Sequence, residues 1–368
     1  MQMNDECLGR IAFGVRMPLV TPNCGLVDMI VDSVINASET SGIPISDGDI
    51  IGITESIVAR ANGLYISVDD IANDVKKKMN GAEDIAVIRP IFSRNRFSLI
   101  LKGIARAAKR VYLVLDKNTD EVGNKLYNPY TKVNIVEFYR DLIEGEGAEA
   151  IIRFDNLDRD INLDGLRNFI IATIHTRNED KEAWSEGLDY YGISDESTVI
   201  TLADLCSDRN PDYGVLGTNK ANEECLKLFP TKEVAKEVTL AVVGQIKEKL
   251  GVDVEGIVCG DGCFKSSDGI WELADPEPSP YYTPGLTGTP NEVKLKYLLD
   301  SSNTTEDDVK TVIKNSMEND LKGEMISQGT TPRKIPDIVA SIGDLIMTSG
   351  HAGTPVFVIK NFKKTYAD

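Results

Sequence analysis

The sequence has few histidines, few cysteines and no long hydrophobic run. Only two histidines occur among its 368 residues, His175 and His351, so a histidine-rich metal site is excluded and a Ser-His-Asp triad has only two candidate bases. The six cysteines are too scattered for a disulfide framework, which favours a reducing compartment. The longest apolar runs, 169–174 and 355–359, are far shorter than the roughly 20 residues that span a bilayer.

Several common signatures are also missing. No Walker A motif, GxGxxG fingerprint or GxSxG elbow occurs, so the usual nucleotide-binding and hydrolase patterns are absent. The first ten residues carry Asp5 and Glu6 and no apolar stretch, unlike a secretory signal. Cys259 and Cys263 lie four apart without a second cysteine pair, which excludes a typical zinc site. We therefore predict a cytoplasmic protein with reduced thiols.

The charge is strongly negative and unevenly distributed. There are 58 acidic and 40 basic side chains, for a net charge of −18, which would repel nucleic acids and anionic membranes. Residues 1–115 hold 13 acids and 13 bases, whereas residues 116–213 hold 22 acids and 10 bases. The middle third is thus compositionally distinct. We predict no nucleic-acid or membrane partner, while a local cationic site could still bind a small anion.

Apolar periodicity predicts an α+β or irregular α/β fold, and we expect the α+β class with mixed sheets and packed helices. Helices are expected at residues 26–35, 68–79, 97–108, 133–143, 180–187, 231–250, 291–299, 305–319 and 336–347. Strands are expected at 49–54, 85–88, 111–115, 150–154, 168–174, 198–202, 256–258 and 355–359. The order of the strands does not follow from these patterns.

Two N-terminal segments could contact a ligand. Residues 16–22 contain two prolines that favour an extended backbone able to bind a base or sugar, or they form an edge strand with a turn. Residues 54–63 follow a predicted strand and carry two hydroxyls and Arg60, which suit phosphate contacts. The alternative for this second segment is a polar strand-to-loop transition.

The stretch from Arg89 to Leu115 contains seven bases and no acid. Arg94 and Arg96 lie where a helix is expected to begin, and helix N-termini with nearby arginines bind anions. The alternatives are a solvated basic face or a docking surface for the acidic middle third.

Two later loops could hold phosphate and metal. In residues 214–224, a polar loop expected to precede a short helix, Asn219 and Asn222 can turn the chain or coordinate a cation, and Lys220 can contact phosphate. Asp261 lies between two glycines at the end of a predicted strand, a position typical of a Mg²⁺ ligand, and Lys265 could face the same phosphates.

Four segments, in this order, resemble the coenzyme F-420:gamma-glutamyl ligases. They are Pro-Leu-Val-Thr at 18–21, Asp-Gly-Asp-Ile-Ile-Gly-Ile-Thr-Glu-Ser at 47–56, Gly-Val-Leu-Gly-Thr-Asn at 214–219 and Ile-Val-Cys-Gly-Asp-Gly at 257–262. The resemblance covers residues 11–115 and 213–275. It implies a two-domain ligase fold, a homodimer, GTP as co-substrate, Mg²⁺ or Mn²⁺, and transfer of L-glutamate to a small-molecule acceptor.

The resemblance also implies roles for individual positions. The nucleotide-contacting positions are matched by Pro18, Leu19, Val20, Thr21, Glu55, Ser56, Arg60, Asn222 and Lys265. The metal-binding positions are matched by Asp261 and by Asn219, where the family has aspartate, while Gly262 stands in place of a metal-binding threonine. Arg94, Arg96 and Lys220 are further candidates for the acceptor or for phosphate.

We therefore predict a nucleotide- and metal-dependent gamma-glutamyl ligase. Its expected parts are a ligase-like part at 1–115, an acidic α/β insertion at 116–212 and a ligase-like part with a helical end at 213–368. Because Asn219 and Gly262 both remove metal ligands, the alternative is a non-catalytic nucleotide- or metabolite-binding relative with a degraded metal site.

Overall fold

A computed structural model shows the expected α+β class, with mixed sheets and packed helices. It describes residues 9–121, 123–129, 131–155, 163, 165–173, 188–260, 263–266, 269–272, 279–289, 305–318, 334–347 and 350–365. Across these residues, no helix combines the length and the apolar character that a membrane crossing requires.

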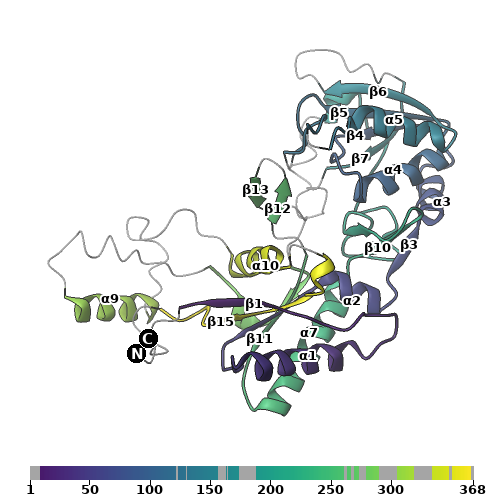
Figure 1. Ribbon diagram of the computed structural model, residues 1–368. Coiled ribbons are helices and arrows are strands. Elements are labelled where there is room, and N and C mark those ends of the chain that lie inside the picture. The colour runs from purple at the N-terminus through teal and green to yellow at the C-terminus, as the bar shows by residue number, and fades with distance from the viewer. Residues whose placement is uncertain are drawn as a thin grey trace.

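The first sheet is mixed and has the order β1-β15-β2-β11-β14. Its strands are β1 (Ile11–Val15), β15 (Val356–Lys360), β2 (Ile50–Thr54), β11 (Glu255–Cys259) and β14 (Tyr281–Tyr282). Only the central pair β2–β11 is parallel. Apolar side chains on one face pack against α1 (Leu26–Ser41) and α7 (Lys232–Leu250), and those on the other face pack against α10 (Ile335–Ile346). Figure 1 shows these elements in its lower half.

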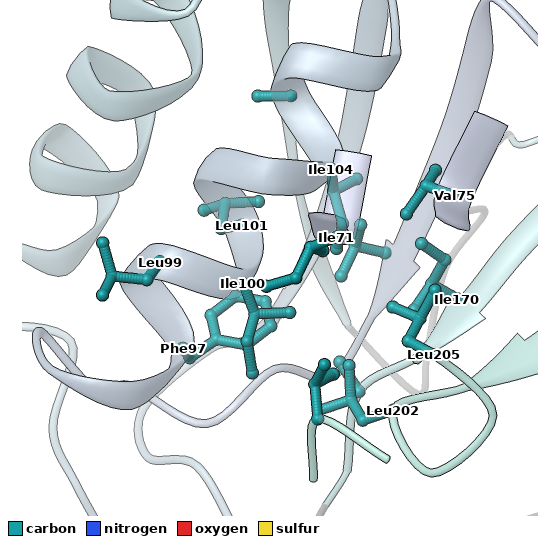
Figure 2. Packing of buried hydrophobic residues seen from close by; sticks show 14 of the residues in the cluster. Ile71, Val75, Phe97, Leu99, Ile100, Leu101, Ile104, Ile170, Leu202 and Leu205 are labelled. Atoms are coloured by element: carbon teal, nitrogen blue, oxygen red, sulfur yellow. The ribbon is translucent and has the colours of Figure 1, made fainter. Parts of the chain in front are cut away.

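The second sheet is wholly parallel and has the order β6-β5-β4-β7-β8. Its strands are β4 (Asp84–Ile88), β5 (Arg110–Asp116), β6 (Glu149–Asp155), β7 (Asn168–Ile171) and β8 (Thr198–Thr201). One face packs against α3 (Val68–Lys78), α4 (Arg96–Ala107) and α5 (Ile135–Gly145), and Figure 2 shows how α4 side chains such as Phe97 and Ile100 fill this core. The other face packs against the 3₁₀ helix η3 (Leu188–Tyr191).

A small antiparallel sheet lies between the two larger ones in Figure 1. Its order is β3-β10-β9, with β3 at Tyr65–Ser67, β10 at Cys225–Leu228 and β9 at Thr218–Lys220. The short helix α2 (Glu55–Ala61) leads from β2 toward β3. The remaining described elements are β12 (Cys263–Ser266), β13 (Gly269–Glu272), η4 (Pro284–Leu286), α9 (Glu306–Glu318) and η5 (Gly350–Ala352).

Most predicted elements are confirmed within a few residues, while one alternative and one prediction are wrong. Residues 55–61 form α2 instead of a strand-to-loop transition, because Thr54 caps the helix by accepting a hydrogen bond from Ser56 N. Residues 218–228 form the β9–β10 hairpin instead of a loop and a short helix. The helices predicted at 180–187 and 291–299 lie outside the described residues.

The parallel sheet crosses the boundary predicted after residue 115. It takes β4 and β5 from the predicted N-terminal part and β6, β7 and β8 from the predicted insertion. The acidic segment therefore completes a sheet that begins before it. The three-part division and the two-domain architecture stay predictions.

The first turn of α3 is closed by a reciprocal pair of hydrogen bonds. Ser67 Oγ accepts from Asp70 N at 3.0 Å, and Asp70 Oδ2 accepts from Ser67 N at 2.9 Å. The bond from Ser67 N, and after it a bond that Ser67 Oγ donates to Asp70 Oδ2 at 2.7 Å, lower the pKa of Asp70 from its ordinary value. A carboxyl whose pKa is lowered in the folded state adds stability above its ordinary pKa and loses it as the pH falls through the lowered value.

We expect Asp70→Asn to lower the free energy of unfolding by about 1 kcal/mol at neutral pH. The difference from the wild-type protein should shrink as the pH falls below about 4, and urea unfolding at several pH values measures it. In a Ser67→Ala background the same substitution should cost clearly less, since the partner hydroxyl is gone. A difference that persists unchanged at low pH would contradict this role of the Asp70 charge.

Candidate functional site

The candidate site lies where the parallel strands β2 and β11 end. Cys259, the last residue of β11, is level with Thr54, the last residue of β2. Thr54 N donates to Pro355 O at 3.0 Å, which fixes the end of β2 against the segment entering β15. The chain then turns directly into α2, so Glu55 and Ser56 lie at the carboxyl ends of two neighbouring strands.

The β9–β10 hairpin brings two more polar side chains to this place. Asn219 in β9 and Lys227 in β10 are register partners. Asn219 Nδ2 donates to Glu55 Oε1 at 2.9 Å, and Thr54 Oγ1 donates to Glu55 Oε2 at 3.0 Å. Glu55 is only 4% exposed. Thr54, Glu55, Ser56, Asn219 and Lys227 are called the Glu55 cluster below.

Lys227 is the member of this cluster that sequence reasoning missed. Its Nζ donates to Ser56 Oγ, across 171 positions of sequence. Burial lowers the pKa of Lys227, the nearby Glu55 carboxylate opposes that shift, and Arg60 adds to it. Lys227 lies between two buried leucines of β10, and that alternation was the one signal that could have placed it on the face opposite to them.

Three other predicted residues lie around the cluster. Arg60 is exposed in the last turn of α2, close enough for its charge to affect Lys227. Lys220 is the last residue of β9, and its Nζ donates to Glu223 Oε1 at 2.8 Å. Asn222 lies in the connection that follows, and its Oδ1 accepts from Glu224 N at 2.9 Å. In this structure Asn222 therefore shapes the turn.

The segment from Pro18 to Thr21 passes the other end of α2. Asn23 N donates to Ala61 O at 2.9 Å, which ties the segment to the last residue of this helix. Val20 is buried in the core beside α1, whereas Pro18 and Thr21 are exposed and Leu19 is 93% exposed. Residues 16–20 belong to no strand of the described chain, so the segment presents its side chains on an irregular backbone.

Most bases of the stretch from Arg89 to Leu115 form ion pairs. Arg89 pairs with Asp155 at 2.6 Å, and Arg106 pairs with Glu146 at 2.8 Å, so the acidic segment does neutralise part of it. Arg96 lies over the ring of Phe229 at 6.0 Å, and Arg94 is exposed at the beginning of α4. The structure thus places Arg96 beside the end of β10, and Arg94 on the surface.

The predicted metal ligands are only partly described. Asp261 and Gly262 lie outside the described residues, and of Lys265 only the backbone, paired with Ile270 in the β12–β13 hairpin, is described. Within the described part of the chain, no three His, Cys, Asp or Glu side chains come together as a metal site.

The Glu55 cluster on its own does not fit a divalent cation. Asn219 turns its amide donor toward Glu55, both oxygens of Glu55 accept hydrogen bonds, and the Lys227 ammonium lies nearby. The described side chains therefore suit an anion better than a metal. The prediction of Mg²⁺ or Mn²⁺ depends on Asp261.

Comparison with known protein families identifies the family of this chain. The family model for F420-0:Gamma-glutamyl ligase matches residues 14–361. The chain belongs to the F420-0:gamma-glutamyl ligase family. The matched range contains every residue of the Glu55 cluster and also the acidic segment 116–212. No curated protein matches the chain.

Membership of this ligase family indicates gamma-glutamyl ligase activity in F420 biosynthesis. Ligases of this family are in general GTP-dependent, and their substrates are glutamate and an F420-type acceptor. In this member of the family, the described residues place a buried carboxylate, a half-buried lysine and a serine hydroxyl at the ends of β2 and β11.

Proposed function

We propose that this ligase binds GTP with the nucleotide phosphates at the Glu55 cluster and uses it to join L-glutamate to a small-molecule acceptor. The observation that supports the proposal is the contact between Lys227 Nζ and Ser56 Oγ beside the buried Glu55. A half-buried ammonium and a hydroxyl at one position form a compact donor site for phosphate oxygens.

Each member of the cluster has a distinct part in this binding. Because Lys227 donates to Ser56 Oγ, the hydroxyl hydrogen of Ser56 is directed away and can donate to a phosphate oxygen. The negative charge of Glu55 favours the protonated form of Lys227 against burial. Glu55 also accepts from Asn219, which holds the β9–β10 hairpin over the site.

The chemistry requires such anchoring, since a glutamate amine does not displace an unactivated oxygen. Transfer of a phosphoryl group to the acceptor carboxylate, with GDP leaving, gives an acyl phosphate. The amine then attacks the carbonyl carbon, phosphate leaves and the amine releases a proton. Donors fixed before the reaction stabilise the charge that develops on phosphate oxygens without reorganising.

Calorimetric titration with GTP, GDP and ATP, each with Mg²⁺ or Mn²⁺, tests this proposal. Lys227→Met should weaken GTP binding by about tenfold or more, because a charge-assisted bond to phosphate is lost. Lys247→Met is the matched control, since Lys247 pairs with Asp253 on the exposed end of α7 and its loss should leave binding unchanged. Absence of heat with every nucleotide, or equal weakening by both variants, would refute the proposal.

The alternative is a non-catalytic relative that binds a nucleotide or metabolite. The contact from the Asn219 amide to Glu55 favours it, because the resemblance implies a metal-binding aspartate at this position and an amide that donates to Glu55 does not replace it. GTP binding without glutamate-dependent release of phosphate would support this alternative. The homodimer and the cytoplasmic location stay predictions.

A further inference from the structure

The parallel sheet has a strand order that is typical of ligand-binding folds. In chain order its strands run 3-2-1-4-5 across the sheet, which is the doubly wound order. From β4 the chain first builds the sheet toward β5 and β6, and it then returns to add β7 and β8 on the other side of β4. The loops that leave β4 and β7 therefore run in opposite directions. In sheets of this kind, ligands bind outside the carboxyl ends of the strands at this reversal. Figure 1 shows the sheet at the top of the molecule, away from α1, α7 and α10.

Two carboxylates stand side by side at this edge. Asp116 ends β5 and Asp155 ends β6, and the two residues are register partners in adjacent parallel strands. Their side chains therefore project from the same face of the sheet, the face that carries Tyr191. A carboxylate at the end of the second strand is the group that accepts ribose hydroxyls in doubly wound sheets, and Asp116 occupies that position.

Asp155 has a buried acceptor without a partner. Its Oδ2 accepts from Arg89 Nε at 2.7 Å and from the Tyr191 hydroxyl at 2.7 Å. Its Oδ1 is also buried, in a residue only 8% exposed, and has no hydrogen-bond partner in the part of the chain that the structure describes. A buried carboxylate oxygen without a donor costs free energy, which a ligand hydroxyl beside it would recover.

The carboxylates of Asp116 and Asp155 carry more negative charge than Arg89 balances. Burial and the charges of Asp155 and Asp120 raise the pKa of Asp116 from its ordinary value, and only Arg89 opposes them. Within the described residues no three acidic side chains converge as a metal site. The edge therefore suits a ligand that donates hydrogen bonds, such as one that carries hydroxyl groups.

The connection from β4 to α4 adjoins this edge of the sheet. The loop from β4 to α4 is held against the end of β5, because Phe92 N donates to Asp120 Oδ2 at 2.6 Å. The helix α4 begins just after this loop and has no acid in its first turn, and the exposed Arg94 lies two residues before it. The start of the helix that follows the first strand is where doubly wound sheets bind phosphate.

We propose that the carboxyl edge of the parallel sheet binds a ribonucleoside 5′-phosphate, with its ribose hydroxyls on Asp116 and Asp155 and its phosphate at the start of α4 beside Arg94. This site shares no residue with the Glu55 cluster. The loop from β4 to α4 has no glycine, so its backbone cannot approach a pyrophosphate as closely as a GxGxxG turn does. A single phosphate therefore fits better than a dinucleotide.

Calorimetry on the full chain with AMP, GMP, CMP and UMP, without divalent metal, tests the site. At least one of them should bind, and Asp116→Asn should weaken that binding by about tenfold or more, because a hydrogen bond to a charged acceptor is lost. Glu149→Gln is the matched control at the exposed opposite end of β6 and should bind like the wild-type protein. The 2′,3′-dideoxy analogue should bind the unmodified chain about tenfold more weakly, which needs no variant to fold.

The outcomes also separate this site from the Glu55 cluster. Binding that survives Lys227→Met and is weakened by Asp116→Asn supports the proposal, whatever happens to GTP-dependent ligation. Binding lost in Lys227→Met but retained in Asp116→Asn would overturn it, as would no binding of any nucleotide. Binding of L-glutamate instead, sensitive to Asp116→Asn, would show that the edge takes an ammonium group and would equally overturn it.

Discussion

Replacing Lys360 with methionine is expected to lower the free energy of unfolding by about 3–5 kcal/mol, because it leaves a buried carboxylate unpaired. Lys360 in β15 donates to Asp49 Oδ2 and to Pro44 O, and both charged side chains are buried. Asp49 accepts a further hydrogen bond from Ser46 N at 2.8 Å, so the pair fixes the turn before β2. Equilibrium unfolding in urea measures the change.

Lys363→Met is the matched control for this prediction. Lys363 pairs with Glu255 at 3.3 Å on the surface, and exposed pairs contribute no more than about 1 kcal/mol. Replacing both members of the buried pair, in Asp49→Asn with Lys360→Met, should recover part of the loss since no charge stays buried alone. Equal effects of the two lysine substitutions would show that burial does not govern the Asp49–Lys360 pair.

Replacing Gly52 with alanine is expected to cost about 3 kcal/mol, because the added carbon would overlap an aromatic ring in a close-packed core. A Cβ at Gly52 would lie 1.9 Å from Phe357 Cζ, where the ring crosses from β15 over β2. The ring also packs on Gly343 of α10, where an added Cβ would lie 2.2 Å from Phe357 Cε1, so the helix leaves the ring little room to move. A thermal or urea unfolding transition measures the loss.

We expect Gly244→Ala, at a glycine within a helix, to raise the free energy of unfolding instead of lowering it. Gly244 lies in α7 and nothing comes within 4 Å of a Cβ built there, so alanine should stabilise the protein by about 0.5–1 kcal/mol. In addition, Phe357→Leu combined with Gly52→Ala should cost less than the sum of the two single changes. Additive costs would mean that the ring is not what excludes a side chain at residue 52.

The helices were predictable because their periodicity is local. The apolar residues of α3 and α4 recur at helical spacing, and the structure buries those faces together. Strand order was not predictable, because a buried parallel strand such as β5 is an apolar run without information on its neighbours. The doubly wound order became visible only when β6, β7 and β8 were placed beside β4 and β5.

The candidate site was predictable only where a resemblance guided it. That resemblance singled out Glu55, Ser56 and Asn219, and the structure brings these three together. Sequence reasoning missed Lys227, because a lysine between leucines in a strand ordinarily points to water. Only α2, which is distant in the sequence, gives it a polar partner. Such contacts depend on how the small sheet meets the first sheet, which no local pattern encodes.

The helix α4 joins the two proposed sites physically. Its beginning follows the loop that Asp120 holds, while farther along it Lys102 and Arg106 both pair with Glu224, in the connection between β9 and β10. The same hairpin carries Asn219 and Lys227. We therefore expect a ligand that displaces α4 to change nucleotide binding at the Glu55 cluster, and thermodynamic linkage would make that effect reciprocal.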